Sequence, residues 1–397
     1  MTDILKIILI FIVTVFLLKK RWNLGLVMAF SSVILAVFYM LKPQDFIGAF
    51  LKASTDTTTI TLIIALTLIR MFENIMRTKG IMQEMMDSFR GIVMDRRILM
   101  ASMPALIGLL PSMGGALFSA PMVEEASEGI SIAPEKKAFV NYWFRHPWEF
   151  VLPLYPGLVL ASAITAYPIR ELILVNLPYA LSLIAGGIIW GLMGIEVQKE
   201  GFKKISKRGL LSFVPLALIL LMVIVFHLDL SISIGAVIMV LFIVLKYSYK
   251  NILQTFKQGF SWDIVAIILG VMTFKAVLSS SGAVTNISTF FSEEGIPILP
   301  VLFVIPFISG LLTGLTIGFI GSTFPIILGL ENAQNIGAIS FAFASGYVGV
   351  LLSPVHLCLV LTKEYFKADM AGIYRRTIKA GILILSIAVI WYIVLAS

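Results

Sequence analysis

The segment from Pro104 to Pro121 reads PALIGLLPSMGGALFSAP, two apolar runs separated by Pro111-Ser112-Met113-Gly114-Gly115. A similar segment, PFISGLLTGLTIGFIGSTFP, runs from Pro306 to Pro325, which places its first residue 202 positions later. Proline, serine and glycine favour turns, so each segment predicts a helical hairpin instead of one continuous helix. The apolar flanks predict that both hairpins are re-entrant, entering and leaving a bilayer on the same side.

The composition indicates an all-α polytopic membrane protein. Of the 397 residues, 59% are apolar and 13% are charged, whereas soluble domains are about half apolar and about a quarter charged. Because a spanning helix needs about 20 apolar residues, the chain accommodates about ten spans besides the hairpins at 98–122 and 298–330. The spans are predicted near 3–19, 23–41, 57–76, 138–164, 171–194, 209–227, 231–246, 262–280, 336–362 and 378–396.

The basic residues predict the orientation in the membrane. The net charge is +8, and the lysines and arginines lie in short loops between apolar runs, which indicates topology and not nucleic-acid binding. Placing the Lys19–Arg21 loop in the cytoplasm also places most other basic residues there, provided that both hairpins return to their side of entry. We therefore expect a multi-pass protein of the cytoplasmic (inner) membrane with both termini outside.

An internal repeat relates the two halves of the sequence. Gly108 aligns with Gly310 at a shift of 202 residues, and Trp190 aligns with Trp391 at a shift of 201. Each half holds an odd number of predicted spans, so repeats at 1–197 and 198–397 lie in opposite orientations. Secondary transporters share this inverted-repeat plan and bind substrate and ions where broken helices meet near the midplane.

Each half contains two predicted breaks, one at the hairpin tip and one in the following span. The span breaks are predicted at Asn141–Glu149 in the first half, and at Ser345–Tyr347 and Ser353-Pro354 in the second. Helix N-termini attract anions, whereas helix C-termini and unwound carbonyls bind cations such as Na⁺. Close helix packing is the competing explanation for the small residues.

The breaks supply the candidate binding residues. Those expected to bind substrate are Ser112, Gly114, Gly115, Asn141, Arg145, His146, Thr316, Gly318, Ser322, Thr323 and Ser345. Those expected to bind the coupling ion are Ser119, Asn141, Thr313 and Ser353.

Four ionisable residues lie near the breaks, where a charge costs roughly 2.5–3.5 kcal/mol on insertion scales. Arg145 is suited to bidentate binding of a substrate carboxylate, with His146 as hydrogen-bond donor or proton carrier. Alternatively, Arg145 and Glu149, four residues apart, form an internal pair that braces the broken helix. Glu149 and His356 are expected to be structural or proton-carrying residues.

Several functional classes lack their motifs in this sequence. It has no Gly-x-x-x-x-Gly-Lys phosphate loop and no His-Glu-x-x-His motif. The single cysteine, Cys358, lies in an apolar run, which excludes a disulfide framework or a thiolate metal cage and indicates inert packing. Because His146 and Glu149 alone are too few ligands, we expect no transition metal and no cofactor, with Na⁺ or H⁺ as the coupling ion and the hairpin tips as its site.

The segments Ser112–Gly115, Asn141–Glu149 and Gly318–Pro325 resemble a family of prokaryotic integral membrane proteins. This family is grouped in the ion transporter superfamily with the divalent anion/sodium symporters and the gluconate permeases. The resemblance covers essentially the whole chain and implies an elevator-type homodimer. In such a dimer scaffold helices (1–56 and 207–258) hold still while transport parts (57–197 and 259–397) move. The Ser-Asn-Thr motifs that bind carboxylates in the symporters are absent here.

These observations together predict a secondary active transporter of a small organic anion, above all a carboxylate, and not an enzyme. A passive anion channel is the first alternative, because channels also use re-entrant loops. An intramembrane hydrolase using Ser112 or Ser119 with His146 is the second. The expected partners are the organic anion, the lipid bilayer and a second copy of the chain, with no nucleic acid.

Overall fold

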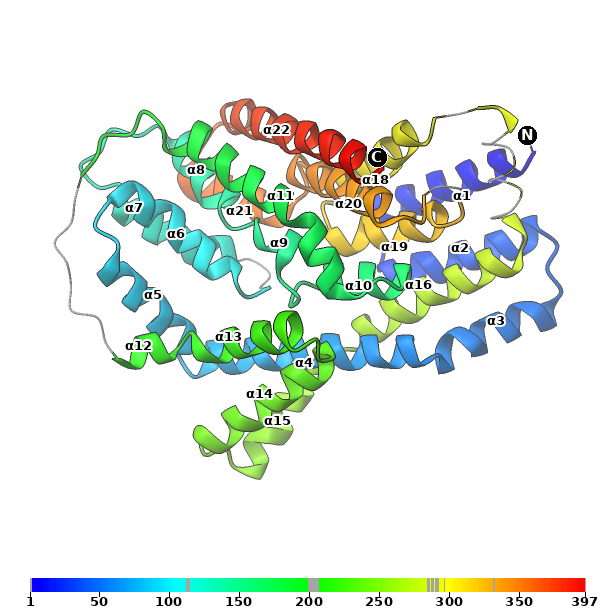
Figure 1. Cartoon of the computed structure of the whole chain (residues 1–397), viewed down its shortest axis with the longest axis horizontal. Helices are drawn as coiled ribbons and strands as arrows, with labels where there is room; N and C mark the ends of the chain where they lie inside the picture. The colour runs from blue at the N-terminus through cyan, green and yellow to red at the C-terminus, as the bar shows by residue number, and fades with distance from the viewer. Residues whose placement is uncertain are drawn as a thin grey trace.

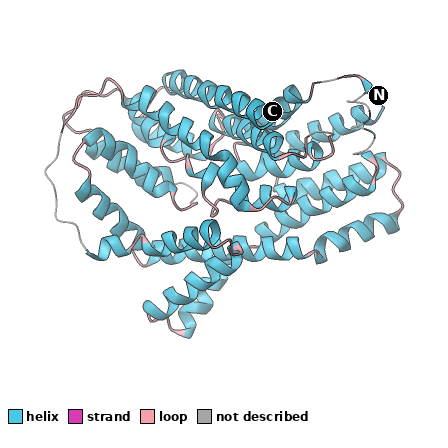
Figure 2. Ribbon diagram, viewed as in Figure 1, coloured by secondary structure: helices cyan, strands magenta, loops and turns pink. Residues whose placement is uncertain are grey.

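Helices are the only regular elements of the computed structural model, which describes residues 2–111, 115–198, 207–283, 286, 289, 293–295, 297–330 and 333–396. Figure 2 shows this all-helical architecture, without a strand in the described part of the chain. Five helical stretches in that part are long and apolar enough to cross a membrane: Thr57–Thr78, Pro134–Thr165, Ile169–Leu192, Trp262–Ser280 and Met370–Leu395. The protein is therefore an all-α membrane protein.

The first half of the chain forms eleven described helices and one π-helical turn. They are α1 (Thr2–Lys19), α2 (Leu24–Phe38), α3 (Pro43–Thr55), α4 (Thr57–Thr78), α5 (Ile81–Ile92), α6 (Arg96–Gly108), α7 (Gly115–Ala126), α8 (Pro134–Trp143), α9 (Trp148–Val151), α10 (Pro156–Thr165) and α11 (Ile169–Gly187), which continues into the π-helical turn Ile188–Leu192.

The second half forms ten described helices and one π-helical turn. They are α12 (Lys207–Leu211), α13 (Val214–Leu220) with the π-helical turn Leu221–Val225, α14 (Leu230–Val244), α15 (Tyr249–Gly259), α16 (Trp262–Ser280), α18 (Ile298–Thr313), α19 (Thr316–Ile327), α20 (Ile336–Leu351), α21 (Leu357–Phe366) and α22 (Met370–Ala396). Helices α6 and α18 begin 202 residues apart, and α11 and α22 begin 201 residues apart.

Equivalent caps start equivalent helices. The side chain of Asn23 accepts hydrogen bonds from the backbone N–H groups of Gly25 and Leu26 at the start of α2. Asp229 accepts from those of Ser231 and Ile232 at the start of α14. Each side chain satisfies amide groups that have no partner within the helix.

Three helices lie where the sequence pattern predicts only loops: α3, α5 and α15. They have 11 to 13 residues, shorter than a span, and charged residues interrupt their apolar positions. A search for continuous apolar runs therefore passes over them. Local signals do mark two of them, because Pro43 occupies the first turn of α3 and the Ser248 side chain caps α15.

The second half corrects one predicted break. Ser345–Tyr347 lies inside the continuous helix α20. The Ser345 hydroxyl donates to the carbonyl of Phe341, one turn back, which leaves the helix intact. Gly346 packs against the ring of Phe319 with no space for a side chain. The small residues here serve close packing, whereas the predicted break at Ser353-Pro354 does separate α20 from α21.

Helices of one half pack on helices of the other. The long helices α4 and α22 run roughly along the longest axis of the molecule, and α14 with α15 projects from α4 (Figure 1). Helix α16 packs along α2 and α3, with Gly25 and Gly270 in backbone-to-backbone contact. Helix α4 packs on α14 and α15 in the same way that α16 packs on α2 and α3.

An aromatic cluster fills the space between the two broken helices. The rings of Phe150 and Tyr347 meet edge to face, with centroids 4.7 Å apart. Tyr179 of α11 and Phe343 of α20 complete the cluster around Phe150. These side chains are almost fully buried, so the cluster fixes the position of one break relative to the other.

Candidate functional site

The two broken helices face each other, and each supplies a partner for the other's irregular backbone. The Tyr347 hydroxyl donates to the carbonyl of His146, 2.9 Å away. The Tyr142 hydroxyl donates to the carbonyl of Leu351, 3.0 Å away. Because an unpaired carbonyl is costly in an apolar interior, these reciprocal bonds stabilise both breaks at one place.

The first break also docks on α6. The Trp148 indole donates to the carbonyl of Ala105 at 2.7 Å, and the Tyr155 hydroxyl donates to the carbonyl of Gly108 at 2.5 Å. Gly108 itself packs against the carbonyl of Arg145, where a side chain would clash. The hairpin α6–α7 is thereby held against the break at Phe144–Pro147.

The positively charged guanidinium of Arg145 lies at the start of α7. The residue is only 4% exposed, and its guanidinium lies against Gly115, so close that a Cβ atom there would clash with Nη1. Gly115 is the first residue of α7. The N-terminal end of a helix carries about half a positive charge, so two positive ends converge in a buried region.

Asn141 joins three elements at the centre of the site. Its Nδ2 donates to the carbonyl of Ala116 and to the hydroxyl of Thr362, each at 3.0 Å. Its Oδ1 is buried and accepts no hydrogen bond from the part of the chain that the structure describes. Buried polar atoms are almost always paired, so this oxygen is available to a cation or to a donor on a ligand.

The second hairpin reaches the first break through Thr316, the first residue of α19. Its hydroxyl donates to the carboxylate of Glu149 at 2.5 Å. Its methyl group packs against Gly157 of α10. The Glu149 carboxylate, predicted as structural or proton-carrying, therefore connects the two halves.

Two histidines and the cysteine form a compact group between the breaks. Nε2 of His146 lies 3.1 Å from Nε2 of His356. One ring nitrogen of each histidine and Sγ of Cys358 lie within 4.8 Å of one another. All three residues are at most 9% exposed. The sequence pattern associated His146 with Arg145 and Glu149 only, and indicated inert packing for Cys358.

The remaining predicted residues make bonds within their own hairpins or helices. Hydroxyl groups of Ser119, Thr313, Ser322, Thr323 and Ser345 donate to carbonyls three or four residues earlier. The Ser353 hydroxyl accepts from the N–H of Val355, and Gly318 packs against Thr313. Ser112 and Gly114 lie outside the described residues.

The sequence reasoning missed Tyr142, Tyr347, Cys358 and Thr362. Their side chains contact the other half of the chain across more than 200 residues or, for Cys358, a histidine of that half. Tyr142 lies inside the stretch that was singled out, and Cys358 follows His356 by two residues. Tyr347 likewise ends the predicted break Ser345–Tyr347, so a position within or close to a predicted break was the signal that these three residues shared.

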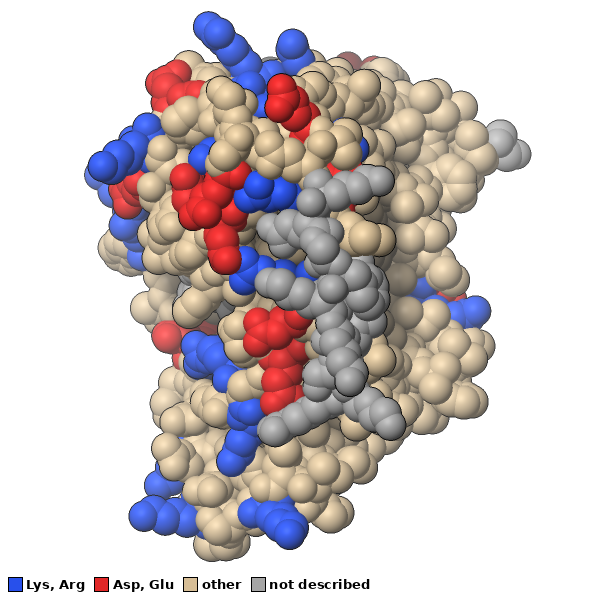
Figure 3. Space-filling model, turned by 90° about the vertical axis from the view of Figure 1, so that its left-hand side faces the viewer, with Lys and Arg blue, Asp and Glu red and all other residues tan. Residues whose placement is uncertain are grey.

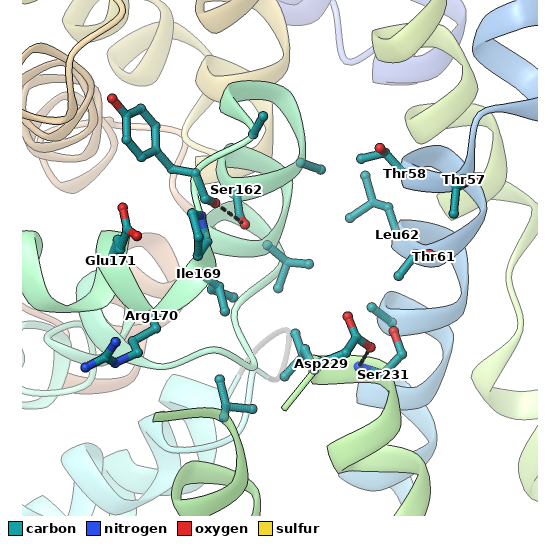
Figure 4. A pocket seen from close by; sticks show the side chains of 18 of the residues that line it. Thr57, Thr58, Thr61, Leu62, Ser162, Ile169, Arg170, Glu171, Asp229 and Ser231 are labelled. Atoms are coloured by element: carbon teal, nitrogen blue, oxygen red, sulfur yellow. Dashed lines mark hydrogen bonds between the residues drawn. The ribbon is translucent and has the colours of Figure 1, made fainter. Parts of the chain in front are cut away.

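A large cavity with polar and apolar lining lies between α4 and the α10–α11 turn. Its volume is about 900 Å³, and it is lined by α4, the α10–α11 turn, α16 and the turn before α14. Figure 4 shows Thr58 and Thr61 on one side, Ser162 and Arg170 on the other, and Asp229 below. The Lys275 ammonium donates to the carbonyl of Ile164 at 2.5 Å and so links α16 to the end of α10.

Charged side chains of both signs gather at one end of the molecule. Figure 3 shows them on the end formed by α5 to α8. They include the ion pairs Arg90–Glu125, Lys137–Glu124 and Arg97–Asp95. This end is separate from the apolar helix surfaces and from the buried site.

Over residues 3–395 the sequence matches the family described as "Protein of unknown function (DUF401)". No curated protein matches the chain.

Proposed function

The chain belongs to the DUF401 family, and from the geometry of its site we propose that it is a secondary active transporter of a small organic anion, above all a carboxylate, coupled to Na⁺ or H⁺. The observation that carries the proposal is the position of Arg145. Its buried guanidinium lies against the N-terminal residue of α7. Two converging positive ends in an apolar interior form a site for an anion.

The arrangement of the helices supports transport over a fixed binding function. Two hairpins and two broken helices, one of each per half, surround the charged centre. We propose that they belong to inverted repeats in about ten spans, with both termini outside the cytoplasmic membrane. Broken helices at a repeat interface are the features from which transporters build their substrate sites.

The packing between the halves suggests which parts move in an elevator mechanism. Helix α16 is packed backbone to backbone on α2, and α4 packs on α14 and α15. We therefore propose a stationary unit of α1–α4 and α12–α16, which adds α4 and α16 to the scaffold expected at 1–56 and 207–258. The cavity lies between this unit and the α10–α11 turn. In each protomer of a homodimer, the moving part would slide along the stationary unit at this place.

The coupling ion has two sets of candidate ligands. Oδ1 of Asn141 accepts no hydrogen bond from the described residues, and with the nearby hydroxyl of Thr362 it offers oxygen atoms suited to Na⁺. Glu149 and His146 offer groups that exchange protons. Uptake driven by a Na⁺ gradient at constant pH selects the first set, and uptake driven by a pH gradient without Na⁺ selects the second.

The test is uptake of radiolabelled mono- and dicarboxylates into proteoliposomes, together with thermal shifts in NaCl and KCl. A carboxylate at 100 times its dissociation constant adds about 2.7 kcal/mol to the free energy of unfolding. Arg145→Gln is expected to abolish both uptake and shift, whereas Arg375→Gln, a change at an exposed arginine, leaves them unchanged. Carboxylate binding that survives Arg145→Gln contradicts the proposal.

The same assay separates the two alternatives. Flux that does not saturate and needs no ion gradient indicates an anion channel. An intramembrane hydrolase that uses Ser119 is not favoured, because Ser119 donates within α7 and both ring nitrogens of His146 face other groups, the Tyr142 carbonyl and His356. A Ser112→Ala variant that still transports would argue against a hydrolase that uses Ser112, which lies outside the described residues.

A further inference from the structure

We propose that His146, His356 and Cys358 bind a divalent transition-metal ion of the Zn²⁺ class at the junction of the two broken helices. This site is distinct from the anion site and from the Na⁺ ligands proposed above, and it shares only His146 with the candidate proton-exchanging groups. The three side chains come from both halves: His146 follows α8, His356 precedes α21, and Cys358 lies in the first turn of α21. Their ligand atoms lie within 4.8 Å of one another.

Hydrogen bonds to the backbone fix the tautomers of both rings. Nδ1 of His146 lies 2.6 Å from the carbonyl of Tyr142, and Nδ1 of His356 lies 2.8 Å from the carbonyl of Gly314. A carbonyl oxygen only accepts, so each Nδ1 carries the hydrogen. A neutral imidazole has one N–H, which leaves a lone pair on both Nε2 atoms.

These two lone pairs face each other across 3.1 Å. Two acceptors at that distance repel unless a cation or a donor lies beside them, and the Cys358 thiol is the group placed to donate its proton or, as a thiolate, to share a metal ion with both rings. Histidines that bind metals usually donate their other N–H to a carboxylate or a backbone carbonyl, and both rings do so here. In a tetrahedral Zn²⁺ site with Zn–N bonds of about 2.0–2.1 Å, the two nitrogens are about 3.3 Å apart, close to the observed separation.

The third ligand determines the class of metal. Imidazole and thiolate ligands suit Zn²⁺, Co²⁺ and copper, whereas Na⁺, Mg²⁺ and Ca²⁺ prefer oxygen. Sγ of Cys358 lies within 4.8 Å of the ligand atoms of both histidines, and a Zn–S bond of about 2.3 Å would draw it toward them. The sequence alone offers His146 and Glu149 as ligands, but the fold replaces that pair with three converging groups.

Three protein ligands leave one position of a tetrahedral ion open. Metal binding would displace the thiol proton of Cys358 and join the two halves at a single point. The fourth position would take water or an anionic oxygen.

The test uses the full chain, purified in detergent with an affinity tag that contains no histidine and stripped with a chelator. Co²⁺ is titrated as the probe and Zn²⁺ as the competitor. We expect one Co²⁺ per chain and a thiolate-to-cobalt charge-transfer band, which Zn²⁺ removes. Because Cys358 is the single cysteine, this band has one source, and Cys358→Ser is expected to eliminate it.

Control variants separate the site from non-specific binding. His146→Ala and His356→Ala are expected to weaken Co²⁺ binding at least about tenfold. The third histidine of the chain, His227, is exposed with φ at 56°, and His227→Asn keeps a residue that tolerates this conformation and leaves binding unchanged.

A second measurement keeps the test decisive if a variant fails to fold. Zn²⁺, but not Mg²⁺, should raise the Tm of the unaltered chain. The proposal is overturned if the stripped, folded chain binds no Co²⁺, or binds it without the charge-transfer band.

Discussion

Gly108 packs against the backbone carbonyl of Arg145 so closely that only a hydrogen atom fits between the two residues. The second half repeats this relationship, with Gly310 against the carbonyl of Gly346. In both halves the first helix of the hairpin is therefore docked on the broken helix that follows, by contact between backbones.

This contact predicts that neither glycine tolerates a methyl group. We expect Gly108→Ala and Gly310→Ala each to destabilise the protein by about 1–3 kcal/mol, the usual cost of overpacking. Thermal unfolding in detergent measures the effect. Gly48→Ala is the matched control, because a Cβ there meets no atom within 4 Å, and alanine is the better helix former. Equal losses of stability at 48 and 108 would refute the explanation.

Gly115→Ala should weaken anion binding without unfolding the protein. The added Cβ occupies the position of the Arg145 guanidinium, which is the flexible end of a side chain and is displaced. The expected result is loss of the carboxylate-dependent thermal shift with a Tm near that of the unaltered chain. Gly235→Ala, where a Cβ makes only an ordinary contact with Leu68, should retain the shift. If Gly115→Ala keeps the full carboxylate-dependent thermal shift, Arg145 does not bind the anion.

Glu149 and Thr316 should be energetically coupled across the two halves. Their hydrogen bond joins the first break to α19. A double-mutant cycle with Glu149→Gln and Thr316→Val, which keeps the methyl packed on Gly157, is expected to give about 0.5–2 kcal/mol of coupling. Thermal or denaturant unfolding of the four proteins supplies the values. Additive effects would show that the bond contributes nothing.

Asp95, which caps the start of α6, should make the free energy of unfolding depend on pH in acidic solution. Hydrogen bonds from the Arg97 side chain and backbone lower the pKa of Asp95 below its usual value. A carboxylate with a lowered pKa stabilises the folded state above its unfolded pKa of about 3.9, and this contribution is lost as the pH falls through the folded pKa.

The measurement is Tm between pH 6 and the acid limit of the detergent-solubilised protein. We expect Asp95→Asn to have a lower Tm at neutral pH and a smaller fall in acid. Asp87→Asn, at an exposed carboxylate one helix earlier, should keep the steeper fall. If the plots of Tm against pH for Asp95→Asn and the unaltered chain are parallel, the hydrogen bonds between Asp95 and Arg97 do not cause the loss of stability in acid.

The sequence predicts features that depend on local chemistry. Pro111 and Gly314 mark the hairpin tips, and Pro147 and Pro354 mark the breaks, because proline and glycine act on the backbone beside them. Ser345 and Gly346 misled the same reasoning, since small residues also permit the close packing that Phe319 makes here.

The composition of the site could not be predicted in the same way. His146 meets His356 only because two chain segments 210 residues apart fold against each other. Cys358 and Thr362 have no local pattern that assigns a partner. Arg145 and Glu149 could be identified from the sequence. A charged side chain in an apolar run costs free energy wherever the fold places it, so such a residue indicates a functional or structural role.

The exchange of partners between the halves has a consequence for assembly. Helix α16 of the second half is fixed to α2 of the first by the Gly25–Gly270 contact, and α4 of the first half lies on α14 and α15 of the second. The halves are interlaced, so neither contains a complete core of its own. The repeat is thus a unit of sequence and not of folding. A chain cut between 198 and 207 should yield fragments that aggregate in detergent when made singly and recover a native assembly only when both are synthesised together.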